Sequence, residues 1–289
     1  MIDTTETVLC PVTKYPARFY CTKGAATYYL EPKMGTIFQA KMPTVSQMGE
    51  YADHEYESGV YKDYSNAREL KAATARPRLA AIKELTSGKH LLDIGCSTGF
   101  FLEVAADEGF DIRGVEFSSV AISMAKPKIA ERIVLGDINT LLAREASKFD
   151  VVTCFDIIEH VQDPPKLLRE IWDILSPGGI IALSTPDTGH LLRYLMKSKW
   201  PMLQPMQHTV LFSKASMDFA LRDCGFTNVR VETAYKTLTI DYLGGQLVAT
   251  NPGLHRLYNA IRWAVPRPLR AKPIMFNIGE LLAFAQKPL

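Results

Sequence analysis

The stretch formed by residues 91–102 combines an acid with two closely spaced glycines. Asp93 lies within an apolar run, and Gly95 and Gly99 follow it before a second apolar pattern of helical periodicity. Glycines let the backbone approach a ligand closely, and the first N–H groups of a helix are unpaired and positively polarised. The pattern therefore predicts a loop that binds a cofactor. The carboxylate of Asp93 would repel a pyrophosphate but attract an ammonium group, which argues against NAD.

Two further acids stand where later strands are predicted to end. Glu116 closes the run 111–116, and its carboxylate can accept hydrogen bonds from both hydroxyls of a ribose. Asp137 follows the run 133–135 and can accept a hydrogen bond from an adenine amino group. Ligands bind at the carboxyl edge of open α/β sheets. Either acid alone could simply close a strand, but the three acids together favour a nucleoside cofactor.

Strands and helices alternate from residue 89 to about residue 235. Alternation at this spacing implies βαβ units and a parallel sheet. The predicted strands are 90–94, 111–116, 133–135, 149–155, 180–185 and 229–232, and the predicted helices are 99–108, 119–126, 165–175 and 213–224. The acids and glycines named above all fall at the ends of these elements.

Less regular segments flank this core. Residues 1–45 mix prolines and glycines with short β-prone pieces and predict a small ribbon, and residues 46–88 predict lid helices. Residues 89–235 form the predicted cofactor-binding core. Residues 236–289 predict a helical insertion followed by a closing strand near 278–286.

The composition is that of an ordinary globular protein. Its 289 residues are 47% hydrophobic and 22% charged, which is enough for a full core. The net charge of +2 and the absence of a long basic block argue against nucleic-acid binding. No apolar run reaches the roughly 18 residues of a membrane span, and the N-terminus lacks the pattern of a secretory signal. Five scattered cysteines indicate reduced thiols, so we expect a cytoplasmic protein.

Taken together, these residues and elements resemble those of the class I S-adenosylmethionine-dependent methyltransferases. The resemblance covers residues 89–235 and implies a Rossmann-like, seven-stranded, mostly parallel sheet flanked by helices, with an antiparallel terminal strand. The family usually has another glycine where this chain has Ser97. The resemblance rests on Asp93-Ile94-Gly95-Cys96-Ser97-Thr98-Gly99, Glu116, Gly136-Asp137, Phe149-Asp150-Val151-Val152 and Leu175-Ser176-Pro177-Gly178-Gly179.

The resemblance also implies which residues bind S-adenosylmethionine. The loop from Gly95 to Gly99 would meet the methionine end of the cofactor, Glu116 the ribose and Asp137 the adenine. The residues expected to bind the cofactor are Asp93, Gly95, Cys96, Ser97, Gly99, Phe100, Glu116, Phe117, Asp137, Ile138, Phe155 and Asp156.

An acidic segment with a histidine follows the fourth predicted strand. In the related quinone-biosynthesis O-methyltransferases an acid-x-x-Glu-His arrangement is associated with a divalent metal, and Asp156, Glu159 and His160 match it. A metal there would lower the pKa of an acceptor hydroxyl. The favoured alternative is that no metal binds and that Glu159 and His160 cap the helix beginning near Asp163 and hydrogen-bond backbone groups. His160 remains a catalytic candidate in either case.

A second histidine precedes the predicted helix 213–224. His208 lies in the segment Gln207–Ser213, which resembles a family segment that commonly carries a histidine. A hydroxyl acceptor must lose its proton before or during methyl transfer, and a histidine can serve as the general base. His208 is therefore the preferred catalytic base, with a backbone-bonded loop histidine as the alternative.

The N-terminal ribbon resembles a zinc ribbon that has lost its ligands. Many relatives begin with two Cys-x-x-Cys pairs, and here Cys10 and Thr13 occupy the first pair while Glu31 and Met34 occupy the second. A structural zinc site needs four good ligands. We therefore expect a ribbon without metal.

Three other groups of residues have a functional and a structural interpretation. Tyrosines 51, 56, 61 and 64 could cover the cofactor or simply pack a lid helix. Arg76 and Arg78 could reach the cofactor carboxylate, but solvated helix positions are favoured. The basic segment Leu254–Lys272 could contact anionic lipid or a phosphate-bearing acceptor, but a solvated face is favoured because Pro266 and Pro268 interrupt it.

The sequence thus predicts a methyltransferase that transfers a methyl group to an oxygen of a small molecule. A sugar or glycan precursor, or a secondary metabolite, is the favoured acceptor. The alternatives are a metal-assisted enzyme with a quinone- or lipid-type acceptor, and a non-catalytic binding module of the same fold. The sequence does not identify the acceptor itself, because a fold does not determine its substrate. The sequence likewise indicates no oligomeric state.

Overall fold

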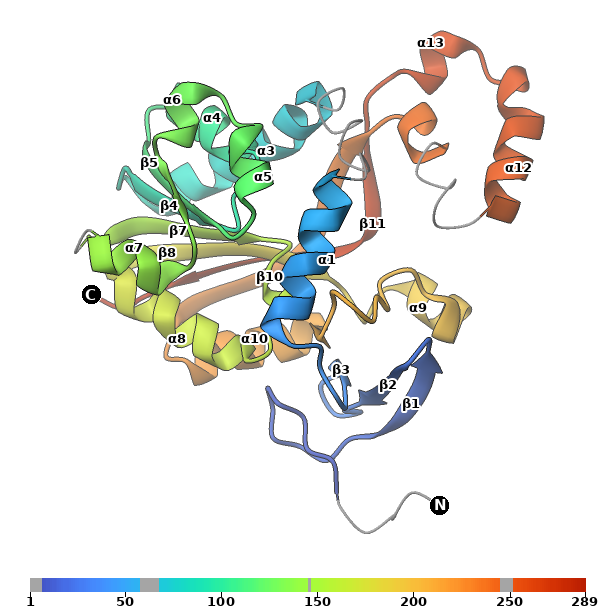
Figure 1. The fold of residues 1–289 in the computed structure, drawn as a ribbon, viewed down its shortest axis with the longest axis horizontal. Coiled ribbons are helices and arrows are strands. Elements are labelled where there is room, and N and C mark those ends of the chain that lie inside the picture. Colours follow the sequence, from blue (N-terminus) through green and yellow to red (C-terminus); the bar gives the residue numbers. More distant parts are fainter. Residues whose placement is uncertain (1–6, 58–67, 145–146, 245–251) are drawn as a thin grey trace.

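The computed structural model describes residues 7–57, 68–144, 147–244 and 252–289 (Figure 1). Its centre is a seven-stranded sheet with the order β10-β11-β8-β7-β4-β5-β6. The strands are β4 (His90–Ile94), β5 (Asp111–Glu116), β6 (Ile133–Leu135), β7 (Phe149–Phe155), β8 (Leu175–Pro186), β10 (Thr227–Leu238) and β11 (Ile274–Gln286). Neighbouring strands from β8 to β6 pair in parallel, whereas β11 pairs antiparallel with both β8 and β10. This architecture confirms the predicted Rossmann-like fold.

Helices cover both faces of the sheet (Figure 1). One face packs against α3 (Arg68–Leu85) and α4 (Phe100–Asp107), and its core includes Ile82, Leu91 and Leu102. The other face packs against α7 (Ile138–Arg144), α8 (Pro164–Ile174) and α10 (Lys214–Asp223), as the second core cluster shows. A sheet buried on both faces needs apolar residues at consecutive positions, which explains why these strands read as apolar runs.

Several predicted boundaries are wrong. The predicted helix 119–126 ends early, as α5 (Ser119–Ser123), because Pro127 has no N–H to continue the helix, and a separate short helix α6 (Pro127–Ala130) begins at this proline. The predicted turn at residues 177–179 lies within β8, and β10 is longer than the predicted strand 229–232.

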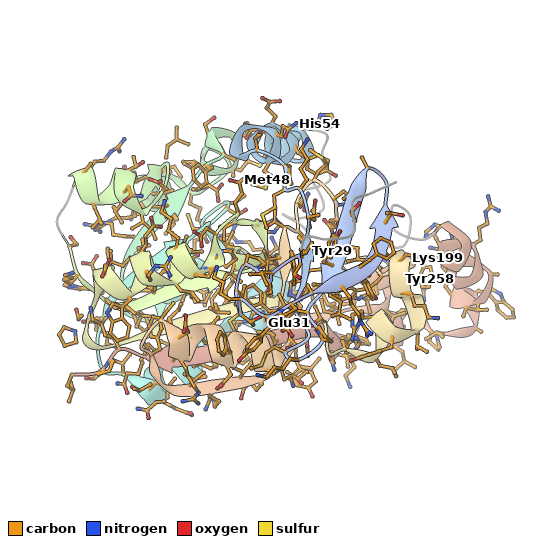
Figure 2. The ribbon with its side chains drawn as sticks, turned by 90° about the horizontal axis from the view of Figure 1, so that it is seen from below. Tyr29, Glu31, Met48, His54, Lys199 and Tyr258 are labelled. Carbon is orange, nitrogen blue, oxygen red and sulfur yellow. The ribbon has the colours of Figure 1, made fainter. Side chains whose placement is uncertain are left out.

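A second, four-stranded sheet has the order β1-β2-β3-β9. Its strands are β1 (Arg18–Lys23), β2 (Ala26–Leu30), β3 (Ile37–Gln39) and β9 (Val210–Leu211). Because β9 directly follows the segment that carries His208, this small sheet fixes the position of that segment. Figure 2 labels Tyr29 and Glu31, which belong to this N-terminal part of the molecule.

The turns that correspond to the zinc-ribbon positions lie against each other. The N–H of Thr13 donates to Cys10 Sγ at 3.5 Å, and the Thr13 hydroxyl donates to Glu31 Oε2 at 3.5 Å. Glu31 is fully buried and also accepts from the N–H of Met34. Hydrogen bonds donated to the buried carboxylate of Glu31 therefore connect the two turns. The descent of this segment from a zinc ribbon stays a prediction.

The remaining elements surround the sheet edge. Helix α1 (Val45–Glu57) precedes α3, while α9 (Leu191–Met196) and the short helix η2 (Lys197–Lys199) follow β8. Between β10 and β11 the chain forms α12 (Pro252–Ile261), η3 (Arg262–Ala264) and α13 (Arg267–Arg270). A helix long and apolar enough to cross a membrane is absent from the described residues. The division into four sequence segments stays a prediction.

Candidate active site

The loop after β4 requires both of its glycines. Gly95 has a φ of +67° and Gly99 a φ of +68°, a left-handed conformation that side chains disfavour. A Cβ atom on Gly95 would lie 2.1 Å from Ile157 Cδ1, and one on Gly99 would lie 2.4 Å from Ile129 Cγ2. Neighbouring side chains thus occupy the space that a larger residue would need. The loop thus packs closely against Ile157 and Ile129, and its close approach to a ligand stays a prediction.

Ser97 and Glu116 connect this loop to the end of the neighbouring strand. The N–H of Ser97 donates to Glu116 Oε2 at 2.8 Å, and the N–H of Ser118 donates to Glu116 Oε1 at 2.9 Å. Ser97 adopts a φ of +52°, so it is a non-glycine residue in the left-handed region. Such strain persists where the surroundings impose it, often at functional sites.

A cavity of about 240 Å³ opens beside the loop. The ends of β4, β7 and β10, the start of α4 and one face of α3 line this cavity. Seven of the twelve predicted cofactor residues line it, namely Asp93, Gly95, Cys96, Ser97, Phe100, Phe155 and Asp156. The structure therefore brings together residues from strands that are far apart in the sequence.

The other five predicted residues do not line this cavity. Glu116 acts through its hydrogen bond to Ser97, whereas Gly99 packs against Ile129. Asp137 accepts hydrogen bonds from the backbone and the hydroxyl of Thr140, both at 2.8 Å. Burial raises the pKa of Asp137, but the hydrogen bonds, chiefly those from Thr140, have the larger combined effect, so the net shift of the pKa is downward. Of the two remaining predicted cofactor residues, Ile138 is buried and Phe117 is 67% exposed.

Asp93 is buried at the base of the cavity. The Thr153 hydroxyl donates to Asp93 Oδ1 at 2.6 Å. Burial raises the pKa of Asp93 to about 7; the Thr153 hydrogen bond opposes this rise, and the negative charge of Glu116 adds to it. A buried carboxylate with a raised pKa is stabilised by binding a proton or by contact with a positive charge. It is therefore suited to contact with a positively charged ligand.

Arg78 corrects one expectation from the sequence. The solvated position expected for both arginines of this helix is wrong for Arg78, which is 8% exposed and lines the cavity, while Arg76 is exposed. Its guanidinium lies 4.6 Å from the centroid of the Phe155 ring, and its Nε and Nη2 atoms have no hydrogen-bond partner among the described residues. Arg78 is thus a buried cation turned toward the space that a cofactor would fill.

The spacing on α3 could have revealed this face. Lys71, Thr74, Ala75 and Arg78 stand at positions i, i+3, i+4 and i+7, which lie on one side of a helix, and all four line the cavity. Burial, together with the nearby charge of Lys236, lowers the pKa of Lys71 to about 6. The Lys71 amine is therefore mainly neutral at neutral pH.

Asp156 belongs to an ion-pair network at the edge of the cavity. Lys236 Nζ lies 2.9 Å from Asp156 Oδ2 and 2.6 Å from Glu280 Oε1. The Ser184 hydroxyl donates to Asp156 Oδ1 at 2.7 Å. Both carboxylate oxygens of Asp156 therefore have partners on β8 and β10. The sequence did not single out Lys236, whose strand it predicted to end earlier.

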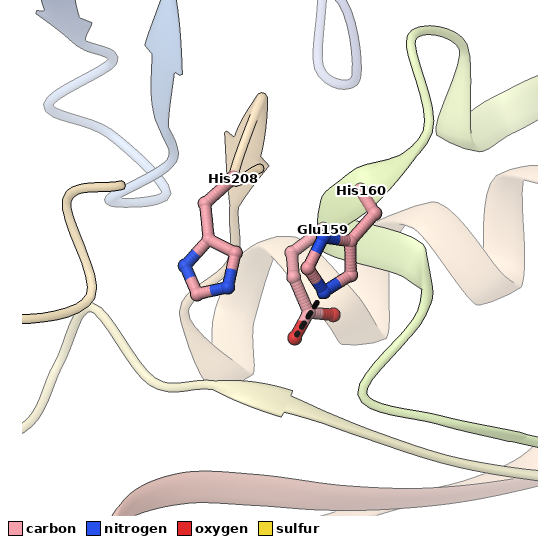
Figure 3. A group of neighbouring side chains, drawn as sticks. All are labelled: Glu159, His160 and His208. Atoms are coloured by element: carbon pink, nitrogen blue, oxygen red, sulfur yellow. Dashed lines mark ion pairs between the residues drawn. The ribbon is translucent and has the colours of Figure 1, made fainter. Parts of the chain in front are cut away.

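Glu159, His160 and His208 form a cluster (Figure 3). The negative charge of Asp156 acts on both Glu159 and His160. Their ligand atoms all lie within 4.8 Å of one another. Glu159 and His160 belong to the short helix η1 (Ile158–His160) after β7, while His208 comes from the loop before β9. The backbone N–H of Thr209 donates to the Glu159 carbonyl at 2.7 Å, which joins the two segments. The structure thus brings together two histidines that the sequence offered separately.

The cluster differs from both sequence interpretations of its members. Asp163 caps α8 by accepting from the N–H of Lys166 at 3.0 Å, so the capping role expected for Glu159 and His160 is wrong. Asp156 is paired with Lys236, and His208 takes its place as the third member of the candidate metal group.

His208 is a neutral imidazole in this environment. Its Nδ1 lies 2.7 Å from the Met202 carbonyl, which can only accept, so Nδ1 carries the proton and Nε2 keeps a lone pair. Burial and the neighbouring His160 lower the pKa of His208 to about 3. Burial also lowers the pKa of His160, although the charge of Asp156 partly opposes this. An imidazole that resists protonation is a poor base on its own but a good metal ligand.

Glu159 supplies a buried carboxylate to the same cluster. It is 1% exposed, and its Oε2 atom has no hydrogen-bond partner among the described residues. Burial raises the pKa of Glu159 well above its ordinary value, and the nearby charge of Asp156 contributes. Two imidazoles and one carboxylate form a donor set that zinc accepts in proteins. The unpartnered oxygen and the neutral rings therefore fit a divalent cation.

The tyrosines of the lid segment are only partly placed by the structure. Tyr51 is exposed on α1, the side chain of Tyr56 is not described, and Tyr61 and Tyr64 lie outside the described residues. Tyr242, which the sequence did not single out, lines the cofactor cavity instead.

The fold and the cavity define a class I S-adenosylmethionine-dependent methyltransferase. A family described as a methyltransferase domain matches residues 64–231, which is more than half of the chain. The chain therefore belongs to the methyltransferase domain family. S-adenosylmethionine is the cofactor of this class, in agreement with the prediction from the loop and its acids.

Curated relatives match about a third of the chain. A ubiquinone biosynthesis O-methyltransferase of Paraburkholderia phymatum is 38% identical over 104 residues, which cover 34% of this chain and 45% of that protein. A protein with the same description from Coxiella burnetii is 34% identical over 104 residues, or 34% of this chain and 44% of that protein. The match thus spans less than half the length of these relatives.

Solved structures show the same fold at low sequence identity. A SAM-dependent methyltransferase from Archaeoglobus fulgidus has a TM-score of 0.54 and 20% identity, covering 80% of this chain and 100% of its own. A SAM-dependent methyltransferase from Thermotoga maritima, described as a possible histamine N-methyltransferase, has a TM-score of 0.52 and 19% identity over 81% of this chain and 99% of its own. These similarities concern the fold alone.

Proposed function

We propose that this protein transfers the methyl group of S-adenosylmethionine to a hydroxyl oxygen of a small molecule. The observation that carries the proposal is the cluster of Glu159, His160 and His208, in which Glu159 and His208 are buried and His160 is partly exposed. The charge of Asp156, which lines the cofactor cavity, acts on both Glu159 and His160. An amine can attack a sulfonium methyl group without assistance once it is neutral, whereas a hydroxyl needs help to lose its proton. A cluster of potential proton acceptors or metal ligands is more useful to the second reaction.

The cavity would hold the methionine part of the cofactor by opposite charges. Asp93 would face the ammonium group, and the guanidinium of Arg78, which lines the cavity, would face the carboxylate. Glu116, at the end of β5, would accept from the ribose hydroxyls with the lone pairs that its bonds to Ser97 and Ser118 leave free. Contact of Asp137 with the adenine remains part of the proposal.

The reaction needs alignment more than activation of the donor. The acceptor oxygen gives up its proton and attacks the methyl carbon, while the carbon–sulfur bond breaks and its electron pair returns to sulfur. The positive sulfonium thereby becomes the neutral thioether of S-adenosylhomocysteine. The protein has to orient the acceptor along the sulfur–methyl axis and exclude water.

The cluster would assist deprotonation of the acceptor hydroxyl. Glu159, through Oε2, and the rings of His160 and His208 would be the ligands of a divalent cation. Such a cation supplies Lewis-acid chemistry, lowering the pKa of a hydroxyl placed beside it. The Met202 carbonyl fixes the His208 tautomer, which leaves Nε2 free to act as a ligand.

The acceptor class follows from the relatives rather than from the pocket. The curated relatives are described as ubiquinone biosynthesis O-methyltransferases, which makes a hydroxyl on a quinone-type ring the first acceptor to test. The comparisons give no support to the sugar or secondary-metabolite acceptor expected from the sequence. The sequence match to these relatives covers 34% of this chain and 45% of the relative from Paraburkholderia phymatum.

Methyl transfer from isotopically labelled S-adenosylmethionine tests the proposal directly. The purified full chain is incubated with hydroxylated quinol-type rings and, in parallel, with otherwise similar aromatic amines. The proposal expects label on oxygen, with equimolar S-adenosylhomocysteine. Label on nitrogen alone would replace O-methylation by N-methylation, and cofactor binding without transfer to any acceptor would favour the non-catalytic binding module.

A further inference from the structure

The segment between Asp241 and Glu280 has an unusual charge pattern. It contains no aspartate and no glutamate, but it contains five basic residues, which are Arg256, Arg262, Arg267, Arg270 and Lys272. None of these side chains lines the cofactor cavity. The methyl-transfer site therefore does not explain this concentration of positive charge.

The same segment exposes large apolar side chains. Trp263 is 82% exposed, which is exceptional for a residue with such a large apolar surface. Single exposed apolar residues are common, but a concentration of them marks an interaction surface. The other exposed apolar residues of this segment are Ile261, Leu269, Ile274 and Met275. We call residues 256–275 the insertion tip.

The insertion tip stands away from the central sheet. Strands β10 and β11 continue beyond their neighbours as a two-stranded ribbon, in which Leu238 pairs with Ile274. Helices α12 and α13 lie at the end of this ribbon and project from one side of the molecule (Figure 1). The tip is therefore accessible to a large, extended surface.

A second segment presents the same combination at the same end of the molecule. Leu191, Tyr194 and Leu195 of α9 are exposed, and Lys197 and Lys199 follow directly in η2. Figure 1 places α9 on the same side as α12, and in Figure 2 Lys199 and Tyr258 lie toward the same end. Two segments that are distant in the sequence thus expose apolar and basic side chains toward the same end of the molecule.

The insertion also contains a cavity of about 340 Å³ that suits a phosphate group. Arg262, Arg267 and Arg270 line it together with Tyr258 and other polar residues. Arg270 Nη1 donates to Asp241 Oδ1 at 2.6 Å, so the single carboxylate among the lining residues is already paired with one of the three arginines. The lining keeps an excess of positive charge.

We propose that the insertion tip docks this protein on the surface of membranes that contain anionic phospholipid. Trp263 and its apolar neighbours would enter the interfacial region, and the arginine-lined cavity would receive a headgroup phosphate. The basic side chains outside the cavity would be attracted by the negative surface potential. Exposed isoleucine, leucine and methionine side chains favour lipid over nucleic acid, whose phosphate backbone offers them no partner. This inference does not depend on the identity of the methyl acceptor.

Vesicle sedimentation with the full chain tests the docking surface. Vesicles of neutral phosphatidylcholine are compared with vesicles that contain phosphatidylglycerol at the same total lipid concentration. We expect binding to the anionic vesicles alone and loss of that binding at high salt. The double variant R262Q/R267Q should bind about tenfold or more weakly, since each basic side chain near the surface contributes about fivefold in affinity. W263S should also weaken binding to the anionic vesicles at low salt, because it removes the largest exposed apolar side chain of the tip.

The matched control removes the same charge elsewhere. Lys128 on α6 and Arg169 on α8 are exposed and distant in sequence from the tip, so K128Q/R169Q should bind anionic vesicles like the unaltered chain. Calorimetric titration with S-adenosylhomocysteine confirms that each variant is folded. Equal loss in both double variants, equal binding to neutral vesicles, or binding of a short RNA without binding of vesicles would each overturn the proposal.

Discussion

The rings of His160 and His208 meet edge to face, with their centroids 4.9 Å apart, and both rings border the carboxylate of Glu159. The two histidines are supported differently. His208 is fixed through Nδ1 by the Met202 carbonyl, whereas His160 belongs to the short helix after β7. Edge-to-face contact between neutral rings is favourable, but two imidazolium rings at this distance would repel each other. The arrangement is thus suited to a pair of uncharged nitrogen ligands.

The first prediction concerns metal binding by this cluster. E159Q and H208A should each bind Zn²⁺ at least tenfold more weakly than the unaltered chain, because each removes one ligand of the candidate donor set. Zinc titration by calorimetry, with metal content measured after dialysis, checks this. His54 is exposed on α1 and serves as the matched control, since H54A should leave affinity unchanged (Figure 2).

The same variants separate a metal ligand from a general base. H208A should lower methyl transfer to a hydroxyl acceptor while leaving the affinity for S-adenosylhomocysteine intact. If His208 serves the metal, excess chelator should lower the activity of the unaltered chain as well. Full activity in chelator, combined with loss in H208A, would instead support the base role predicted from the sequence. Unchanged turnover in H208A would contradict both roles.

The second prediction concerns Arg78 and the carboxylate of the cofactor. R78Q should weaken S-adenosylhomocysteine binding about tenfold to a hundredfold, because a buried hydrogen bond to a charged group contributes roughly 1.5 to 3 kcal/mol. Methylthioadenosine lacks the amino-acid part, so its affinity should not change. Calorimetry with both ligands checks this. R76Q on the exposed side of the same helix is the control, and an equal loss for both ligands would show that Arg78 merely supports the fold.

Much of the fold, together with the cofactor loop, can be predicted from the sequence alone. The apolar runs place β4, β5, β6 and β7 at the right positions, because strands that are buried on both faces are encoded locally. The glycines and Asp93 are likewise recognisable, since a tight loop with unpaired helix N–H groups needs them in consecutive order. The fold and the cofactor class are therefore predictable from this sequence.

The catalytic cluster could not be assembled in the same way. Bringing His208 beside His160 depends on β9, a strand of two residues that pairs with the N-terminal sheet. Such a short element leaves no periodic pattern. Pairing of Asp156 with Lys236 likewise depends on the length of β10, which reaches beyond the predicted strand. The neighbours of His208, Asp156 and Lys236 depend on contacts between distant segments. The strands and the glycine loop, in contrast, can be predicted from local patterns.

The third prediction uses two glycines with similar backbone conformations. Gly95 and Gly109 have φ values of +67° and +87°, but a Cβ atom would collide with Ile157 at the first and would meet nothing within 4 Å at the second. G109A should therefore cost only the backbone strain of about 1 to 2 kcal/mol. G95A should cost a further ~1 to 3 kcal/mol for overpacking. Urea unfolding measures both, and equal costs would contradict the crowding of the loop.

The fourth prediction concerns the pH dependence of cofactor binding through Asp93. Its pKa of about 7 in the folded protein, raised mainly by burial, means that the carboxyl group is largely protonated at pH 5.5 and half ionised at pH 7. The ionised form attracts the ammonium group of the cofactor, which stays protonated throughout this range. The affinity for S-adenosylhomocysteine should therefore rise about tenfold between pH 5.5 and pH 7.

The same shift has the opposite effect on the stability of the unliganded protein. In the unfolded chain Asp93 ionises near pH 4, whereas in the folded chain it keeps its proton up to about pH 7. Folding therefore binds a proton between these values, so this group's contribution to stability falls as the pH rises from 4 to 7. D93N should remove the share of Asp93 from both dependences, so that the affinity profile flattens and the stability falls less steeply between pH 4 and pH 7. Methylthioadenosine, which has no ammonium group, should bind with no dependence on Asp93 ionisation. A pH profile that persists in D93N would assign the titration to another group.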